Sequence, residues 1–290
     1  MVLLIKIQQS ALDVRKMTEK EEPQEEVIPI TEMERKISLD LWRTKLHDEI
    51  VGIKQREEHM AKSRQFTRDL ELFGEVFEKK KGENETIGFV GYRKGLWDDE
   101  KDKLERRLVI KLFSKSMYYQ GTLEEMVGRE FTRSLSARHD FPSFNLMIDD
   151  YEYLIPLNKI RGGWFVPEWF VFRIDDEKGF IPVILKHKMG LGIDYRVVNG
   201  IGDKQFGKID GKRFDVGGRY EITLKATDER LVDNVLVRAL ILFAASLKFH
   251  EDIIKKIKKG TKKMRKDEWQ PDLSNEEKLL RRNPRAILRK

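Results

Sequence analysis

One segment limits the possible folds of this chain more than any other: residues 231–249, with the sequence LVDNVLVRALILFAASLKF. On a helical wheel its large apolar side chains cover every side, with alanines between them. A helix that is apolar all round either spans a membrane or lies at the centre of a folded domain. The uncharged run between Arg238 and Lys248 has only nine residues, whereas a membrane span needs about 20. We therefore predict a helix that is buried inside protein.

Six segments before this helix have the composition of β-strands, and turn residues separate them. Asn199-Gly200 and Asp210-Gly211 are strong signals for short hairpin turns, because both residues of each pair tolerate positive φ. No helical pattern interrupts the series, so we expect an antiparallel meander wrapped around the apolar helix. The predicted strands are Glu152–Pro156, Trp164–Ile174, Phe180–His187, Ile193–Val198, Lys204–Ile209 and Arg213–Lys225.

Residues 85–150 give a weaker signal for more strands. Ile87–Tyr92 and Leu104–Met117 have strand character, and the second alternates in hydropathy. Gly121–Met126 has the features of a helical turn, with Thr122 as its cap. Residues 133–145 are irregular, and we make no prediction there.

The first 80 residues divide into two parts. Residues 1–30 are predicted to be a disordered lead-in or extension, since residues 18–30 are acidic and contain two prolines. Met1 and Met17 are both plausible start positions. Thr31 and Glu34 have the spacing of a capping box. Apolar side chains then recur at steps of three, four and seven residues up to Phe77, so we predict a long amphipathic helix or helical pair over residues 31–80.

This predicted helix leaves two interpretations open. Its apolar stripe packs on the chain's own barrel, or it forms a coiled coil that mediates self-association or binds a protein partner. The segment Gly162–Phe172 is apolar on both strand faces and leaves a similar choice. It lies between two packed layers, or it presents an aromatic surface for bases or lipids.

The net charge is concentrated at the C-terminus. Residues 251–290 hold 14 Lys and Arg against seven Asp and Glu, an excess equal to the +7 of the whole chain. Phosphate is the natural partner of such a segment, either in nucleic acid or at an anionic membrane surface. A third interpretation is a solvated helix end whose cations complement the helix dipole. The candidate ligand-binding residues of this basic extension are Lys255, Lys256, Lys258, Lys259, Lys262, Lys263, Arg265 and Lys266, and Trp269 beside them suits either partner.

No catalytic motif is recognisable. The chain has no cysteine, which excludes disulfides, thiolate metal sites and cysteine nucleophiles. The five histidines are scattered, and His187, between two lysines, is expected on the surface. The acidic pairs and glycine pairs have the features of solvated turns and hairpins. We therefore expect no catalytic residue, no metal and no cofactor.

Four segments resemble the tubby-like C-terminal superfamily, which includes the LURP-one-related proteins and the phospholipid scramblases. They are Phe180–His187, Gly202–Ile209, Phe214–Leu224 and the hydrophobic helix within Asp233–Leu247. The resemblance implies a closed antiparallel barrel threaded by the C-terminal helix, over residues 85–250 with the helix at 231–249. It also implies recognition of an anionic ligand, with phospholipid head groups as the family precedent.

The expected protein is therefore an α+β, non-enzymatic binding protein. Its C-terminal basic residues recognise phospholipid head groups at a membrane surface. The alternatives are a nucleic-acid- or ribosome-associated protein that uses the same residues, and a structural assembly protein that uses residues 31–80. The expected location is cytoplasmic, with peripheral attachment to a membrane.

Overall fold

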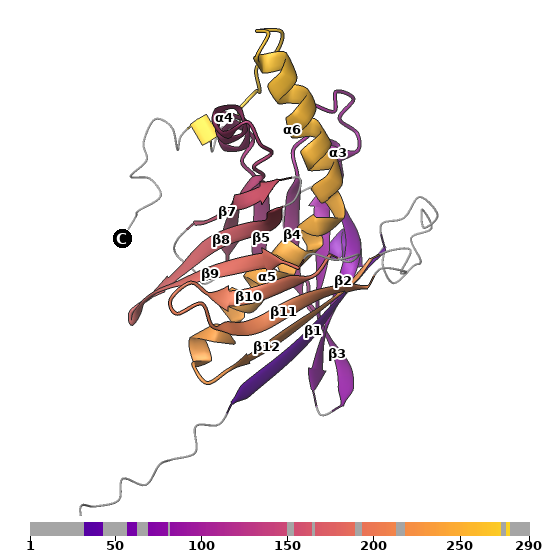
Figure 1. The fold of residues 1–290 in the computed structure, drawn as a ribbon. Coiled ribbons are helices and arrows are strands. Elements are labelled where there is room, and N and C mark those ends of the chain that lie inside the picture. Colours follow the sequence, from indigo (N-terminus) through magenta and orange to yellow (C-terminus); the bar gives the residue numbers. More distant parts are fainter. Residues whose placement is uncertain are drawn as a thin grey trace, which may run out of the picture. The chain divides into compact units, whose positions relative to one another are not determined.

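A computed structural model describes residues 32–42, 57–62, 69–80, 82–149, 154–163, 166–188, 193–212, 218–273 and 277–278. The described residues all belong to the second of two compact units, Glu32–Lys290. Twelve strands among them form a closed barrel in which every neighbouring pair is antiparallel (Figure 1). The strands are β1 (Met33–Leu41), β2 (Leu70–Lys80), β3 (Glu83–Arg93), β4 (Val109–Ser114), β5 (Tyr119–Glu125), β6 (Ser143–Ile148), β7 (Ile155–Gly163), β8 (Val166–Asp176), β9 (Gly179–His187), β10 (Tyr195–Asn199), β11 (Gln205–Lys212) and β12 (Arg219–Ala226).

Strand β1 closes the barrel, because it pairs with β2 on one side and β12 on the other. The predicted helix over residues 31–80 is therefore wrong at both ends, and the barrel begins at residue 33 instead of 85. Within this stretch the structure describes helix only at residues 57–62. Strand β2 misled the prediction because its register shifts at Leu72/Gly74 and at Val76/Phe77. Each bulge resets which face a side chain points to, so the apolar spacing mimics a helix.

The expected antiparallel barrel with a C-terminal helix is confirmed. Helix α5 (Asn234–Ser246) begins at Asp233, whose carboxylate accepts a hydrogen bond from the Val235 N–H at 3.0 Å. Phe243 of α5 meets Phe170 of β8 and Tyr195 of β10 at ring-centroid distances of 5.1 and 5.2 Å. Phe249, in the 3₁₀ turn after α5, meets Phe73, Tyr92 and Trp97 at 5.3 to 5.6 Å. The helix thus fills the barrel with contacts to strands on opposite sides.

The alternation of strand direction gives the barrel two different ends. We call the end where α5 leaves the barrel the helix end, and it carries α3 (Lys94–Trp97), α4 (Val127–Ala137) and α6 (His250–Met264). The opposite end carries the turns β2–β3, β8–β9 and β10–β11 and the start of α5 (Figure 1). Antiparallel pairing therefore brings α3, α4 and α6, which are far apart in sequence, to one end.

Several local predictions need correction. Residues 121–125 lie in strand β5 and are not a helical turn. Asp210-Gly211 lies inside β11, where a Cβ on Gly211 would stand 3.0 Å from the Ile193 carbonyl oxygen, so glycine serves close packing there. At the turn after Asn199 the positive φ values occur at Gly202 and Asp203. Residues 133–145, for which there was no prediction, form the end of α4 and the start of β6.

Candidate anion-binding site on helix α6

Helix α6 has one face packed against the protein and one face in solvent. Its buried stripe follows steps of three and four residues and consists of Ile253, Lys256, Ile257, Gly260 and Thr261. Gly260 lies directly against α4, since a Cβ there would stand 2.3 Å from the Phe131 ring. The packing fixes the rotation of α6 about its axis, and with it the set of lysines that face solvent.

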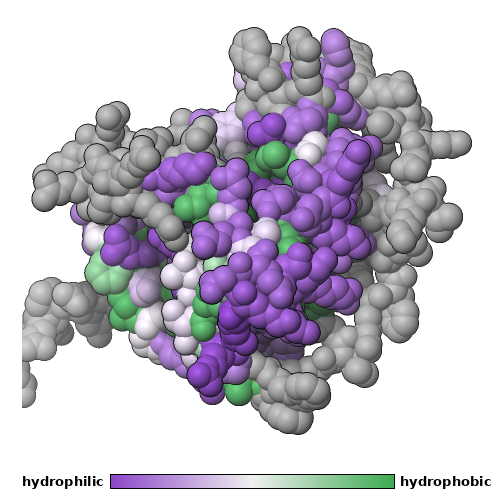
Figure 2. All heavy atoms as spheres, turned by 90° about the horizontal axis from the view of Figure 1, so that it is seen from above, coloured by the Kyte–Doolittle hydropathy of each residue, from purple (hydrophilic) through white to green (hydrophobic). Residues whose placement is uncertain are grey.

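Most of the predicted ligand-binding residues lie on the solvent face. Lys255, Lys258, Lys259, Lys262, Arg265 and Lys266 are exposed, and Lys263 is half-buried. We call these seven side chains the basic face of α6. Figure 2 shows the helix end, where hydrophilic residues cover most of the described surface and hydrophobic residues appear only in small patches.

The carboxylates near the basic face neutralise only part of it. Glu251 pairs with Lys255 at 2.7 Å, Asp140 with Lys258 at 3.7 Å and Glu268 with Lys266 at 3.6 Å. No ion pair joins the other four basic side chains to a described residue. These four, Lys259, Lys262, Lys263 and Arg265, occupy the last two turns of α6 and its C-cap.

Lys256 was predicted to contact ligand, and this prediction is wrong. Its side chain is only 3% exposed and forms an ion pair with Glu125 of β5, which is fully buried. Its Nζ also donates to the Arg106 carbonyl oxygen at 3.1 Å and lies 3.3 Å from a carboxyl oxygen of Glu130 on α4. The side chain points inward because position 256 lies on the same helical stripe as Ile253 and Gly260.

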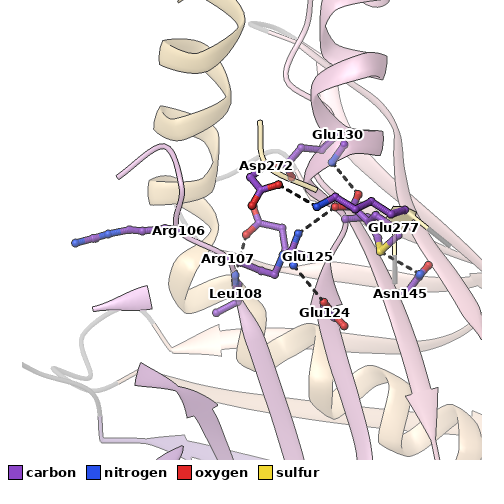
Figure 3. Close-up of polar contacts among 12 residues, drawn as sticks. Arg106, Arg107, Leu108, Glu124, Glu125, Glu130, Asn145, Asp272 and Glu277 are labelled. Carbon is purple, nitrogen blue, oxygen red and sulfur yellow. Dashed lines mark hydrogen bonds and ion pairs between the residues drawn. The ribbon is translucent and has the colours of Figure 1, made fainter. Parts of the chain in front are cut away.

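Glu125 and Glu130, both labelled in Figure 3, share this one lysine and differ in environment. Glu125 accepts hydrogen bonds from Lys256 and from the Leu108 N–H, the latter at 2.9 Å. Glu130 is fully buried and neither of its oxygens has a hydrogen bond of good geometry. Burial, followed by the charge of Glu125, raises the pKa of Glu130 well above its usual value. This shift favours the protonated form of Glu130, beside the ion pair between Glu125 and Lys256.

The segment after α6 packs back onto the helix end. The Trp269 ring meets Phe131 at 5.1 Å, and its Nε1–H donates to Glu105 at 2.7 Å. Glu277 is only 4% exposed. Its carboxylate accepts a hydrogen bond from the Gly128 N–H at 2.7 Å and pairs with Arg107 at 3.1 Å. The basic extension expected over residues 251–290 is therefore part of the fold as far as it is described, and Trp269 already has partners.

A second polar cluster ties the start of α6 to the inside of the barrel. Glu168 of β8 shares strand parity with the buried Phe170 and lies 2.9 Å from His250 Nε2, the first side chain of α6. It also pairs with the buried Lys159 of β7 and accepts from the Tyr195 hydroxyl of β10 at 3.5 Å. Burial opposes ionisation of Glu168, but His250 and Lys159 outweigh it and lower its pKa to about 2.

Neither cluster was predicted from the sequence. Glu125, Glu130 and Glu168 come from segments that are 80 or more residues away from α6 in sequence, so only pairing and packing bring them there. The burial of Lys256 could have been predicted from the sequence, because on a helical wheel it lies on the same side as Ile253 and Ile257. His187, expected on the surface, is half-buried and meets the Tyr195 ring at 5.1 Å.

Comparisons with known proteins identify no relative. No family model, no curated protein and no solved structure matches this chain. In the described ranges, no helix is both long and apolar enough to cross a bilayer, and no group of three or more acidic or histidine side chains could hold a metal ion.

Proposed function

We propose that this protein is a non-enzymatic binding protein that attaches to an anionic membrane surface through the basic face of α6. One observation carries the proposal: the fold buries one lysine of this helix and presents seven basic side chains to solvent. Each basic residue near an anionic bilayer contributes about 1 kcal/mol of binding free energy. The four cations at the C-terminal part of α6 have no described counter-ion, so binding would not first require breaking their ion pairs.

The fold supports the same proposal indirectly. A closed antiparallel barrel around a C-terminal helix is compatible with the tubby-like superfamily, whose precedent ligand is a phospholipid head group. Membership of that superfamily is part of the proposal. The two carboxylate clusters have partners from within the chain that join α6 to the barrel, and they fit a structural role better than a catalytic one.

A nucleic-acid partner is the second candidate, because the exposed face of α6 is basic throughout. Clustered lysine and arginine side chains suit a polyphosphate backbone, since they displace its counter-ions. The assembly function has lost its basis, since it rested on a continuous helix over residues 31–80.

Vesicle sedimentation with the full chain tests the proposal. We expect binding to vesicles that contain phosphatidylserine, no binding to phosphatidylcholine alone, and a strong decrease when Lys255, Lys258, Lys259 and Lys262 are replaced by glutamine. The matched control replaces four exposed lysines of the barrel, Lys36, Lys80, Lys204 and Lys225, in the same way. If both variants lose vesicle binding equally, the binding depends on the net charge of the protein and not on the basic face of α6. Binding to mixed RNA but not to vesicles would favour the nucleic-acid candidate.

A further inference from the structure

Exposed aliphatic side chains occur on one side of the barrel wall, at its helix end. Among the described residues six large hydrophobic side chains are exposed, and three of them lie at the helix end: Ile160 at 44%, Val166 at 38% and Ile193 at 44%. They belong to β7, to the first residue of β8 and to the segment just before β10. We call these three side chains the apolar rim.

Each residue of the apolar rim is within two positions of a member of the Glu168 cluster. Ile160 follows Lys159, Val166 precedes Glu168 by two residues, and Ile193 precedes Tyr195 by two residues. Lys159, Tyr195 and His250 all contact Glu168. His250 is the first residue of α6, so the three side chains of the rim belong to the side of the barrel wall where Glu168 meets the basic helix.

Cations accompany the rim. Arg161, next to Ile160, is exposed and places its guanidinium 4.7 Å from the Trp169 ring centroid. Lys186 pairs with Asp203 and places its Nζ 4.5 Å from the same ring, whereas Lys188, just after the end of β9, is exposed. Two nearby carboxylates already have partners within the protein. Glu168 contacts Lys159, Tyr195 and His250. Asp194 accepts a hydrogen bond from the Gly211 N–H at 3.1 Å.

We propose that the apolar rim inserts into the interfacial region of an anionic lipid bilayer while Arg161, Lys188 and the basic face of α6 contact its head groups. This inference rests on the proposed function and adds the part that enters the membrane. Aliphatic side chains framed by cations match a bilayer interface, where burial of apolar area and attraction to anionic lipids act together. Nucleic acid would instead favour free aromatic faces for stacking, and the Trp169 ring is already in contact with two cations.

A polarity-sensitive fluorophore tests insertion in the full chain. The protein has no cysteine, so Ile193→Cys provides a single labelling position. We expect a blue shift of the label's emission when vesicles containing phosphatidylserine are added, and none with phosphatidylcholine alone. The control label, Tyr118→Cys, lies in the β4–β5 turn at the opposite end, where Tyr118 is 64% exposed, and its emission should not change.

A second measurement separates insertion from electrostatic attachment. High salt screens the contribution of the lysines, so the binding that remains should depend on the rim. Combined Ile160→Ser, Val166→Ser and Ile193→Ser replacements should weaken this salt-resistant binding about tenfold or more, whereas Tyr118→Ser with Phe180→Ser, at exposed positions in the β4–β5 turn and at the start of β9, should not. If anionic vesicles bind but the label at position 193 stays in water, the insertion is refuted and the proposed function stands. If no vesicles bind, both are refuted.

Discussion

Lys256 of α6 and Glu125 of β5 form an ion pair inside the protein, with side chains that are 3% and 0% exposed. Their positions are 131 residues apart in sequence, and the pair joins the C-terminal helix to the barrel wall. It also decides the rotation of α6, since Lys256 faces inward and the neighbouring Lys255 faces solvent. The orientation of the basic face therefore depends on a buried ion pair that lies away from the proposed binding surface.

Removing this lysine should destabilise the protein strongly. In Lys256→Met, Glu125 becomes a buried charge without a partner, and breaking such pairs typically costs about 3 to 5 kcal/mol. Urea denaturation followed by tryptophan fluorescence would measure the loss. Lys255→Met is the matched control, and it should leave the free energy of unfolding essentially unchanged because Lys255 is exposed.

A double variant makes the cause testable. Glu125→Gln removes the negative charge and keeps a carbonyl oxygen that can accept from the Leu108 N–H. Combined with Lys256→Met it should recover part of the lost stability. No recovery in the double variant would mean that packing, and not the unpaired charge, explains the effect of Lys256→Met.

Glu130 should make the protein less stable as pH rises. Its pKa in the folded protein is raised above 4.5 by burial and by Glu125. Its contribution to stability is thus complete below pH 4.5 and is lost as pH rises toward its folded pKa. Glu130→Gln cannot ionise, so relative to wild type it should gain stability as pH rises above 4.5 in urea denaturation. Glu83→Gln, at an exposed position of β3, should show no such trend. Parallel pH profiles for wild type and Glu130→Gln would contradict the expectation.

The sequence was a good guide to the half of the barrel that has regular alternation. Between residues 164 and 209, four predicted strands lie close to β8, β9, β10 and β11, and the apolar segment 231–249 lies inside the barrel as expected. The predicted strand Arg213–Lys225 begins six residues before β12, and Glu152–Pro156 overlaps β7 only at residues 155 and 156. The signals there are local: alternating side chains, turn residues and a helix that is apolar on every side. These local signals are sufficient in this part of the chain, because strands that are consecutive in sequence are also neighbours in the barrel.

The prediction failed where the deciding information is not local. Ile37, Leu39 and Leu41 alternate as a strand should, but the bulges of β2 imitate helical spacing and extended the helical interpretation across both strands. Closure by β1 with β12 joins residues nearly 190 positions apart, which no short pattern reports. For the candidate site, the lysines were visible in the sequence, whereas the burial of Lys256 and the exposure of the apolar rim depend on packing.

The contact between α4 and α6 should tolerate no side chain at position 260. A Cβ on Gly260 would stand 2.3 Å from Phe131 Cε1 and 3.0 Å from the Trp269 ring. Gly260→Ala should therefore lower the free energy of unfolding by about 1 to 3 kcal/mol, although alanine favours helix by about 1 kcal/mol. Adding Phe131→Leu, which removes the clashing atoms, should reverse part of this loss in thermal denaturation. If Gly260→Ala alone stabilises the protein, α6 does not pack against α4 as closely as described.

Acid should weaken the attachment of α6 to the barrel through Glu168. The pKa of Glu168 is lowered from 4.5 to about 2, because His250 and Lys159 outweigh the opposing effect of burial. A carboxyl group with a lowered pKa contributes stability above its unfolded pKa and loses it as pH falls through the folded value. The window of loss is thus from about pH 4.5 down to about pH 2. A shift of this size corresponds to roughly 3 kcal/mol.

Glu168→Gln should remove this acid-sensitive contribution. We expect the variant to be less stable than wild type at pH 6 and the difference to shrink as pH falls toward 2, as measured by urea denaturation at each pH. Glu177→Gln, in the exposed β8–β9 turn, is the control and should follow wild type. Because Glu168 lies two residues from Val166 of the apolar rim, Glu168→Gln should reduce salt-resistant binding to anionic vesicles at neutral pH more than Glu177→Gln does. A variant with wild-type stability at pH 6 would show that the contacts of Glu168 with His250 and Lys159 do not stabilise the start of α6.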